Sequence, residues 1–294
     1  MGHPFTFCYF SQGRGYAITN EEDFDKPDEE LEREEQSIGK DVLAIKGWGN
    51  SSVSRRPMPF GNLSKNWHVS DFHINLARGS KEAAGFDEHL SVTGDNLQLV
   101  AKNIYQNDPA IFQHIVDVMK RRVPGINNVV PLPTQDGRLL LSFHDGAFTD
   151  PFIDKYVSDG TIKMFAYLVL LYDPSPHPLL CVEEPENQLY PSLLWELAEE
   201  FRAYSESAEA KCLFLTHSPD FSNAVQLDEV YWLVKEQGYT QIKRAQDDPQ
   251  LAAFVSEGDQ MGYLWKDVDF SGELSSNDLL GIFFLKSLPQ KRDA

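Results

Sequence analysis

Two acidic residues and one histidine follow two short apolar segments of the chain. The first segment, residues 178–182, runs directly into Glu183 and Glu184, and the second, residues 211–215, is followed closely by His217. Two carboxylates and an imidazole that converge on one point can hold a cation and activate a water molecule. The pattern therefore indicates a site for that chemistry, provided that the fold brings the three side chains together.

The elements that must position these residues can be predicted from the same stretch. Both apolar segments are typical of strands buried on both faces, because they are short, uninterrupted and bounded by proline or charge. Between them, residues 192–204 form an expected helix with one apolar face, made of Leu193, Leu194, Leu197, Ala198 and Phe201. A strand, a helix and a strand form a right-handed crossover, so the strands should be parallel. Their carboxyl ends then lie side by side, at the edge where such sheets bind ligands.

A third polar motif, Ser158-Asp159-Gly160, stands before an apolar helix predicted at residues 162–171. The serine supplies a hydroxyl, the glycine lets the backbone approach a phosphate, and the amino end of the helix favours negative charge. Asp159 opposes an anion unless its side chain caps the helix. The alternative interpretation is a plain helix N-cap, a position that serine and aspartate both favour.

In this order, the motifs Ser158-Asp159-Gly160-Thr161, Glu183-Glu184-Pro185-Glu186-Asn187 and Thr216-His217-Ser218-Pro219 resemble a signature turn, a Walker B motif and a switch histidine. The chain resembles the carboxyl-terminal lobe of ABC-type ATPases of the RecF/SMC/OLD kind. The closest similarity is to bacterial AAA-family ATPases, over roughly residues 65–270. The resemblance implies a partial ABC-type P-loop NTPase fold of the α/β class, a mixed sheet with a parallel centre and antiparallel flanking hairpins, plus a helical insertion.

The resemblance also implies ATP and Mg²⁺ as cofactors and gives each site residue a role. Glu183 holds Mg²⁺, Glu184 is the general base, and His217 senses the γ-phosphate. Ser158, Asp159 and Gly160 form the turn that touches nucleotide. Two features depart from the family: Glu183 stands where most members have Asp, and Gln188 and Tyr190 replace Gly and His in the loop that contacts the other subunit of a dimer.

No Walker A motif occurs in the sequence, since Gly39-Lys40 is followed by Asp41 and has no glycine five positions before it. Without that loop the chain has no phosphate cradle. We therefore expect that Met1 falls inside a longer ATPase, that this chain is truncated and inactive on its own, and that it leaves a sheet edge that needs covering. The expected partner is a second copy in a head-to-tail homodimer, or another chain that supplies the Walker A loop.

The composition limits the class of protein. The 294 residues include 26 Lys and Arg against 45 Asp and Glu, a net charge of −19, which disfavours strong binding to nucleic acid. Residues 20–36 contain ten of the acidic residues, and we interpret this segment as a solvated loop or helix face, with a docking tail for a basic partner as the alternative. Three cysteines without metal spacing, no signal peptide and no membrane-spanning apolar segment predict a soluble cytoplasmic protein.

We predict three regions: a hairpin remnant of the core followed by acidic and loop segments (1–65), a helical insertion or lid (66–125) and the ATPase core lobe (126–294). The further predicted elements are a hairpin at 5–10 and 16–19, a strand at 41–45, helices at 95–107 and 109–122, and hairpins at 126–133 with 137–144 and 229–235 with 239–243. Cys181 and Cys212 fall inside the two predicted buried strands, where they act as small apolar side chains.

Two other functions remain open from the sequence. A non-hydrolysing interaction subunit that keeps the ATPase fold would explain the absence of Walker A. A metal-dependent nuclease could use Glu183, Glu184, Glu186 and His217, although the Ser158-Asp159-Gly160 turn has no role in that scheme.

Overall fold

The computed structural model describes residues 8–11, 14–17, 30, 33–37, 66–207, 211–236, 239–267 and 279–285. The chain divides into two compact units, Met1–Trp67 and His68–Ala294, and each is described by itself below. The strand predicted at 41–45 lies outside the described residues.

The first unit contains a small antiparallel sheet of order β1-β2-β3, with β1 at Cys8–Ser11, β2 at Arg14–Ala17 and β3 at Glu34–Ser37. The predicted hairpin is confirmed, because β1 and β2 pair antiparallel. Two predictions need correction. Part of the acidic segment is a strand, with Glu35 opposite Tyr16, and the hairpin belongs to this separate sheet rather than to the core sheet.

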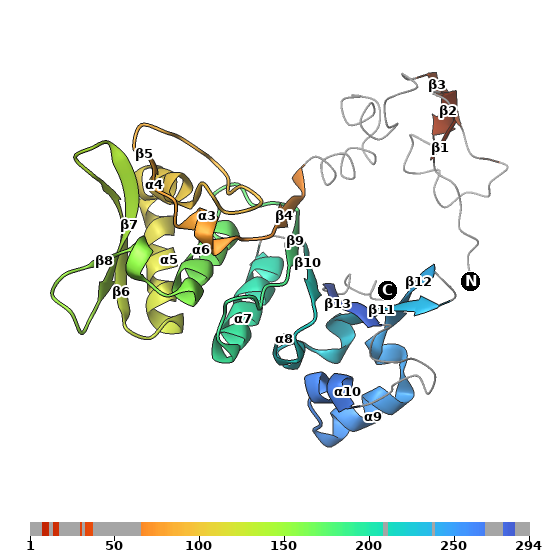
Figure 1. Ribbon diagram of the computed structural model, residues 1–294. Helices are drawn as coiled ribbons and strands as arrows, with labels where there is room; N and C mark the ends of the chain where they lie inside the picture. The colour runs from red at the N-terminus through yellow and green to blue at the C-terminus, as the bar shows by residue number, and fades with distance from the viewer. Residues whose placement is uncertain are drawn as a thin grey trace. The chain divides into compact units, whose positions relative to one another are not determined.

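The second unit is built on a six-stranded sheet of order β12-β11-β13-β10-β9-β4 (Figure 1). Its strands are β4 (His68–Ser70), β9 (Leu179–Glu183), β10 (Lys211–Thr216), β11 (Val230–Glu236), β12 (Tyr239–Arg244) and β13 (Leu279–Leu285). The strands β4, β9 and β10 are parallel to one another. β10 pairs antiparallel with β13, β13 with β11, and β11 with β12. The expected mixed sheet with a parallel centre is therefore confirmed, as is the β11–β12 hairpin.

Two strands of this sheet change the expected organisation. β4 belongs to the core sheet, although it lies at the start of the region that the sequence assigned to a helical insertion. A strand of three residues is too short for periodicity to reveal. β13 pairs with β10 along the side away from β9, so β10 is an interior strand of the sheet.

A second sheet and two helices lie beside the core sheet within the same unit. The sheet contains β5 (Lys81–Glu82), β6 (Ile126–Pro133), β7 (Arg138–Asp145) and β8 (Phe152–Ile153). The predicted β6–β7 hairpin is confirmed. Helices α4 (Leu97–Asn107) and α5 (Pro109–Arg122) pack on this sheet, and their apolar faces are buried as the sequence predicts (Figure 1).

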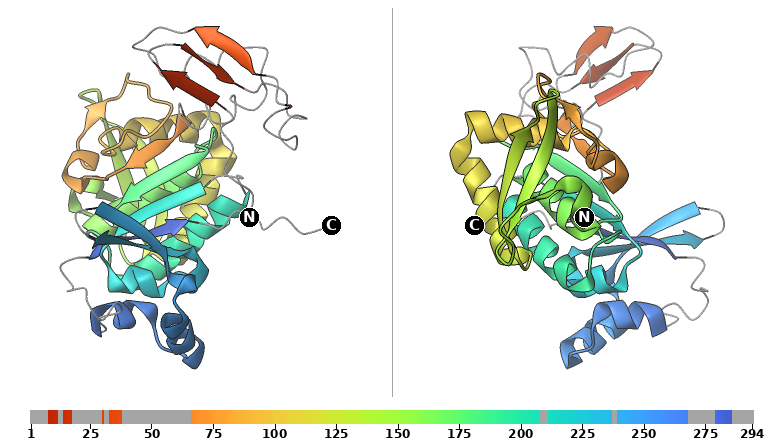
Figure 2. Two further views of the ribbon diagram at one scale, coloured as in Figure 1. Left: turned by 90° about the vertical axis from the view of Figure 1, so that its right-hand side faces the viewer. Right: turned by 60° about the vertical axis from the view of Figure 1, so that its left-hand side comes forward.

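Helix α6 (Asp159–Leu171) lies at the centre of the unit, in contact with α3 (Ile74–Ala77), α4, α5 and α7 (Figure 2). Residues 160–171 are all buried, as expected for a helix that is apolar on every side. Helix α7 (Pro191–Ser207) connects β9 to β10 and buries the five apolar residues predicted for its inner face. The crossover predicted from the sequence is thus present.

The remaining helices follow β10 in the chain: α8 (Pro219–Asn223), α9 (Pro249–Glu257) and α10 (Met261–Asp267). Cys181 and Cys212 are buried in β9 and β10, as predicted. Within the described residues, no helix combines the length and apolar character that crossing a membrane requires.

Candidate functional site at the carboxyl edge of the parallel strands

The structure places Glu183 and His217 at the same edge of the core sheet. β9 and β10 run parallel, with Glu183 opposite Leu215, so the chain after each strand emerges side by side with the other (Figures 1 and 2). Glu183 is the last residue of β9, and its side chain is exposed, as is that of His217. The convergence predicted from the sequence is confirmed at the level of the strands.

Glu184 leaves the sheet by a turn, rather than continuing the alternation of the strand. Its φ of 42° is left-handed, a region that residues other than glycine seldom adopt. Its N–H donates to the carbonyl of Leu215 at 2.8 Å, which fixes the turn to the end of β10. The strand thus ends at Glu183, and the direction of the Glu184 side chain is set by this turn rather than by strand alternation.

Asn187 orients the carboxylate of Glu184. The Asn187 side-chain amide donates to Glu184 Oε2 at 2.5 Å, and its backbone N–H donates to the Glu184 carbonyl at 3.1 Å. The sequence placed Asn187 at the end of the Walker B-like motif and at the start of the loop expected to contact another subunit, without giving it a role toward Glu184. The structure makes it a positioning residue for Glu184.

Glu186 joins the two motifs that come from β9 and β10. Its Oε1 accepts a hydrogen bond from the backbone N–H of His217 at 3.2 Å. Its Oε2 is buried and has no hydrogen-bond partner within the described part of the chain. Glu186 is thus a third carboxylate at this edge, which the sequence considered only for a nuclease.

Lys163 binds the loop after Glu184 through hydrogen bonds to its backbone. This lysine of α6 is almost fully buried, at 2% exposure, and its Nζ donates to the carbonyls of Asn187 (2.8 Å) and Glu184 (3.3 Å). Burial lowers its pKa to about 8, against the opposing effect of the nearby carboxylates of Glu186, Asp71 and Glu184. The sequence did not single out Lys163, since it reads as an ordinary polar residue of an apolar helix.

The lowered pKa of Lys163 predicts a rise in stability at alkaline pH. The unfolded chain, with a lysine pKa of 10.5, binds more protons than the folded chain between pH 8 and 10.5, so the free energy of unfolding rises with pH across that window. Urea unfolding should show wild type gaining about 2 kcal/mol relative to Lys163→Met between pH 7.5 and 9.5. Lys120→Met, at an exposed lysine paired with Asp117, is the control and should track wild type. An equal pH response in Lys163→Met would contradict the prediction.

Ser158 is the N-cap of α6. Its Oγ accepts from the Thr161 N–H at 3.2 Å and lies 2.8 Å from the Thr161 hydroxyl oxygen. The N-cap interpretation is therefore confirmed for this residue. It is compatible with a phosphate contact, because a serine hydroxyl has two acceptor lone pairs and can donate its own proton at the same time.

Asp159 is paired with a cation that the sequence did not identify. Arg78 donates to the Asp159 carboxylate and to the carbonyls of Asp154 and Val157, the latter at 2.6 Å. This guanidinium compensates the charge that was expected to oppose an anion at the turn, and it fixes the backbone leading into α6. The charge of Asp159 is thus balanced by an ion pair with Arg78. Asp159 does not cap the helix, because the N-cap residue is Ser158.

The turn before α6 and the loop after β9 line one open hollow of about 400 Å³. Its walls come from Ser158, Asp159, Gly160, Gln188, Leu189 and Tyr190. Gly160 approaches the loop so closely that a Cβ there would stand 3.2 Å from the Gln188 carbonyl oxygen. The turn before α6 therefore lies against the loop that follows Glu184 in the same chain.

The donor set at the carboxyl edge fits a hard cation. Glu183, Glu184 and Glu186 offer carboxylate oxygens, the ligands that Mg²⁺ prefers, and one Glu186 oxygen is buried without a partner among the described residues. The exposed side chain of His217 adds a group that can hydrogen-bond an anion beside that cation. This arrangement can bind a metal–phosphate group and deprotonate a water molecule next to it.

The model of a protein family described as "AAA domain, putative AbiEii toxin, Type IV TA system" matches residues 24–223, more than half of the chain. A comparison with curated protein sequences found no match.

Three solved structures are similar to parts of this chain. The SMC head bound to the C-winged helix domain of ScpA has a TM-score of 0.45 and 12% identity, over 78% of this chain and 72% of that one. A structure from work on ATP-driven dimerization and DNA stimulated activation of SMC ATPases has a TM-score of 0.41 and 13% identity, over 53% of this chain and 95% of that one. The complex of archaeal ribosomal stalk protein aP1 with the archaeal ribosome recycling factor aABCE1 has a TM-score of 0.39 and 11% identity, over 71% of this chain and 34% of that one.

Proposed function

The chain belongs to this AAA-domain family, and from that premise we propose that it supplies the Walker B, switch and signature elements of an ABC-type ATP-hydrolysing site. The reaction is hydrolysis of the terminal phosphate of ATP. The phosphate-binding Walker A loop comes from a segment outside these 294 residues or from a partner chain, because the sequence contains no such loop.

The observation that carries this proposal is the hydrogen bond between Glu186 and the backbone of His217. It links the Glu-Glu-Pro-Glu-Asn turn after β9 to the Thr-His-Ser turn after β10 at one edge of the sheet. This contact needs both motifs, because Glu186 supplies the acceptor and the turn after β10 supplies the donor. The link holds the turn that contains Glu184 next to the turn that contains His217, which supports their proposed roles as general base and phosphate-sensing group.

Each residue of the site has a separate task in the proposed reaction. Glu184, oriented by Asn187, takes the proton from the attacking water, and His217 hydrogen-bonds the γ-phosphate. Glu183 would hold Mg²⁺, which would neutralise charge on the phosphates. Lys163 keeps the Glu184–Asn187 turn in place through its two carbonyl contacts.

The signature turn acts on nucleotide bound by a second subunit. The first N–H groups of an α-helix have no partner within the helix, and in α6 they lie beside the open hollow. Two copies that pair head to tail would each present this turn to the phosphates held by the other. The Gln188–Tyr190 loop lines the same hollow and would form part of that interface.

The proposal predicts that the isolated chain does not turn over ATP. Adding a strand–loop–helix segment with the G-x-x-x-x-G-K-[ST] motif, fused before residue 1 or as a separate chain, should produce Mg²⁺-dependent turnover. Phosphate release measures the activity, and the control is the same segment with its motif lysine replaced.

Other outcomes would overturn this account. Turnover by the isolated chain that Glu184→Gln abolishes would show that another part of these 294 residues cradles the phosphates. A complex that forms and binds ATP without hydrolysing it would favour the interaction subunit instead. Cleavage of DNA with Mn²⁺ and without ATP would favour the nuclease.

A further inference from the structure

Three histidines and one buried aspartate gather at the opposite end of the core strands from Glu183. His68 is the first residue of β4, and His177 stands two residues before β9 begins. Asp173 lies in the same α6–β9 connection, and His89 in the loop that precedes α4. Three of the eight histidines of the chain thus meet at the amino edge of the parallel strands.

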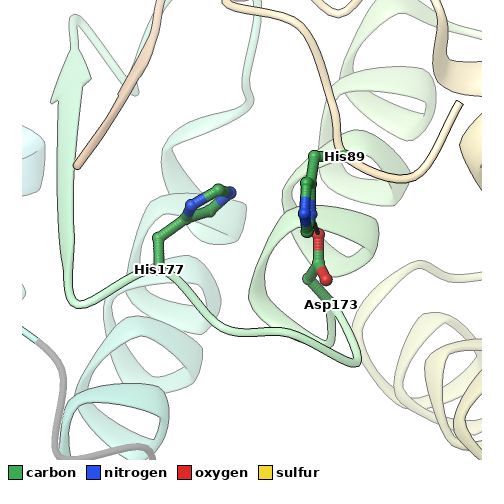
Figure 3. Close-up of side chains that lie close together, drawn as sticks. All are labelled: His89, Asp173 and His177. Carbon is green, nitrogen blue, oxygen red and sulfur yellow. Dashed lines mark hydrogen bonds and ion pairs between the residues drawn. The ribbon is translucent and has the colours of Figure 1, made fainter. Parts of the chain in front are cut away.

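The side chains of His89, Asp173 and His177 face one another across this edge (Figure 3). One ligand atom from each residue lies within 4.8 Å of the other two, and His89 Nδ1 is 2.8 Å from Asp173 Oδ2. The other oxygen of Asp173 accepts from the Ser175 N–H at 2.8 Å, which fixes the carboxylate. The Asp173 side chain is 2% exposed, and a carboxylate buried in this way pairs with a cationic side chain or coordinates a metal ion.

We propose that His89, Asp173 and His177 bind a divalent metal ion, Zn²⁺, at a site separate from the nucleotide edge. Two imidazoles and a carboxylate are common zinc ligands, whereas Mg²⁺ and Ca²⁺ prefer oxygen ligands alone. Zinc bonds of about 2.0–2.1 Å in a tetrahedron put ligand atoms about 3.3 Å apart. The His177 ring therefore needs to approach the His89–Asp173 pair by about 1.5 Å, which is the scale of a small rotation about its side-chain bonds.

The surroundings support a bound ion. The His89 side chain is 38% exposed, so that an ion can enter and a water molecule can complete the coordination. On the inner side, the ring of His68 stacks on His177 with centroids 4.8 Å apart, and Tyr204 donates to the His177 carbonyl at 2.8 Å. These contacts hold the His177 segment as outer-shell groups hold metal ligands in other proteins.

The buried edge of His68 is a second observation at the same place. The residue is 9% exposed, and its Nε2 is buried without a hydrogen-bond partner in the described part of the chain. A buried polar atom without a partner, beside two other imidazoles, indicates that an ion or a water molecule binds nearby. The ion would join the loop before α4 to the α6–β9 connection, and so fix the ends of the two elements that carry the signature turn and Glu183.

The test uses the untagged chain, stripped with a chelator and titrated with Zn²⁺ alone by calorimetry, and with Co²⁺ as a spectroscopic probe. We expect one equivalent of Zn²⁺, a Co²⁺ absorption spectrum typical of tetrahedral coordination, and a thermal midpoint about 5–10 °C higher at a hundredfold excess over Kd. His89→Ala, at a partly exposed loop position, should lower the affinity at least tenfold and remove the Co²⁺ spectrum. Asp173→Asn, which keeps the shape of the side chain, should do the same.

His73→Ala is the matched control. His73 also pairs with an aspartate, Asp71, at 3.4 Å, but it is exposed and belongs to no three-residue cluster among the described residues. It should bind Zn²⁺ as wild type does. Less than one equivalent in wild type, or undiminished binding in His89→Ala with folded circular dichroism, would overturn the proposal. Binding that survives His89→Ala and is lost in His217→Ala would place the ion at the nucleotide edge and overturn it as well. Because the readout needs no ATP, failure of the zinc site and failure of the ATPase proposal are separable.

Discussion

Glu184→Gln should abolish ATP turnover of the chain supplied with a Walker A segment, while ATP still binds. The substitution removes the group that accepts a proton from water, and loss of a general base costs about 10²–10⁴-fold in rate. The glutamine keeps the shape of the side chain and can still accept from the Asn187 amide through its carbonyl oxygen. Phosphate release and equilibrium binding of ATP, measured on the same preparation, separate the two effects.

Glu183→Gln should behave differently, because Glu183 is assigned to the metal. Loss of a ligand or outer-shell group lowers metal affinity about 10–100-fold, so both Mg²⁺ and ATP should bind more weakly. A titration of activity with Mg²⁺ measures this shift. If the two substitutions exchange their effects, so that Glu184→Gln weakens Mg²⁺ and Glu183→Gln affects turnover alone, the assignment of the two acids is reversed.

Asn187→Ala offers an intermediate test of the geometry. It leaves both carboxylates in place but removes the amide that holds Glu184 Oε2. Because Asn187 acts through Glu184, turnover should fall while Mg²⁺ affinity is kept. A loss of activity through a higher Mg²⁺ requirement would instead place Asn187 with the metal.

The second large effect is recovery of activity when two inactive variants are mixed. Ser158→Arg puts a long side chain into the hollow between Gly160 and Tyr190, where a phosphate from the other subunit must approach. It should block dimerisation driven by ATP without preventing one subunit from binding ATP. Glu184→Gln should leave dimerisation intact but stop hydrolysis.

In a heterodimer of Ser158→Arg and Glu184→Gln, both lesions fall on one composite site. This follows because the signature turn of one subunit faces the Walker B turn of the other in an isologous pair. The second site keeps both intact elements, so part of the activity should return on mixing. Sedimentation establishes that heterodimers form, and phosphate release gives the activity.

The control for the mixing experiment is Ser158→Ala. Ser158 caps α6, so any replacement loses about 1 kcal/mol of capping, and alanine shares this loss without filling the hollow. Ser158→Ala should therefore dimerise more readily than Ser158→Arg. A mixture that stays inactive while heterodimers demonstrably form would exclude the role of Ser158 in trans.

The sequence determined the elements whose signals are local. The apolar segments before Glu183 and His217, with an amphipathic helix between them, predicted the parallel pair β9 and β10 and the buried face of α7. The helices α4 and α5 and the two later hairpins were also predicted from periodicity and turn residues. Because carboxyl ends of parallel neighbours share an edge, the sequence alone also placed Glu183, Glu184 and His217 together.

Only the tertiary structure decided how these residues are held. The pair Arg78 and Asp159 joins positions 81 residues apart, and Lys163 reaches a carbonyl 21 residues away. Neither contact leaves a periodic signal, because each depends on how whole elements pack. For the same reason the sequence did not reveal β4, whose three residues become a strand through pairing with β9. Nor did it reveal the cluster of His89, Asp173 and His177, which joins the loop before α4 to the α6–β9 connection. Local patterns fix elements and their edges, whereas long-range packing fixes which side chains meet there.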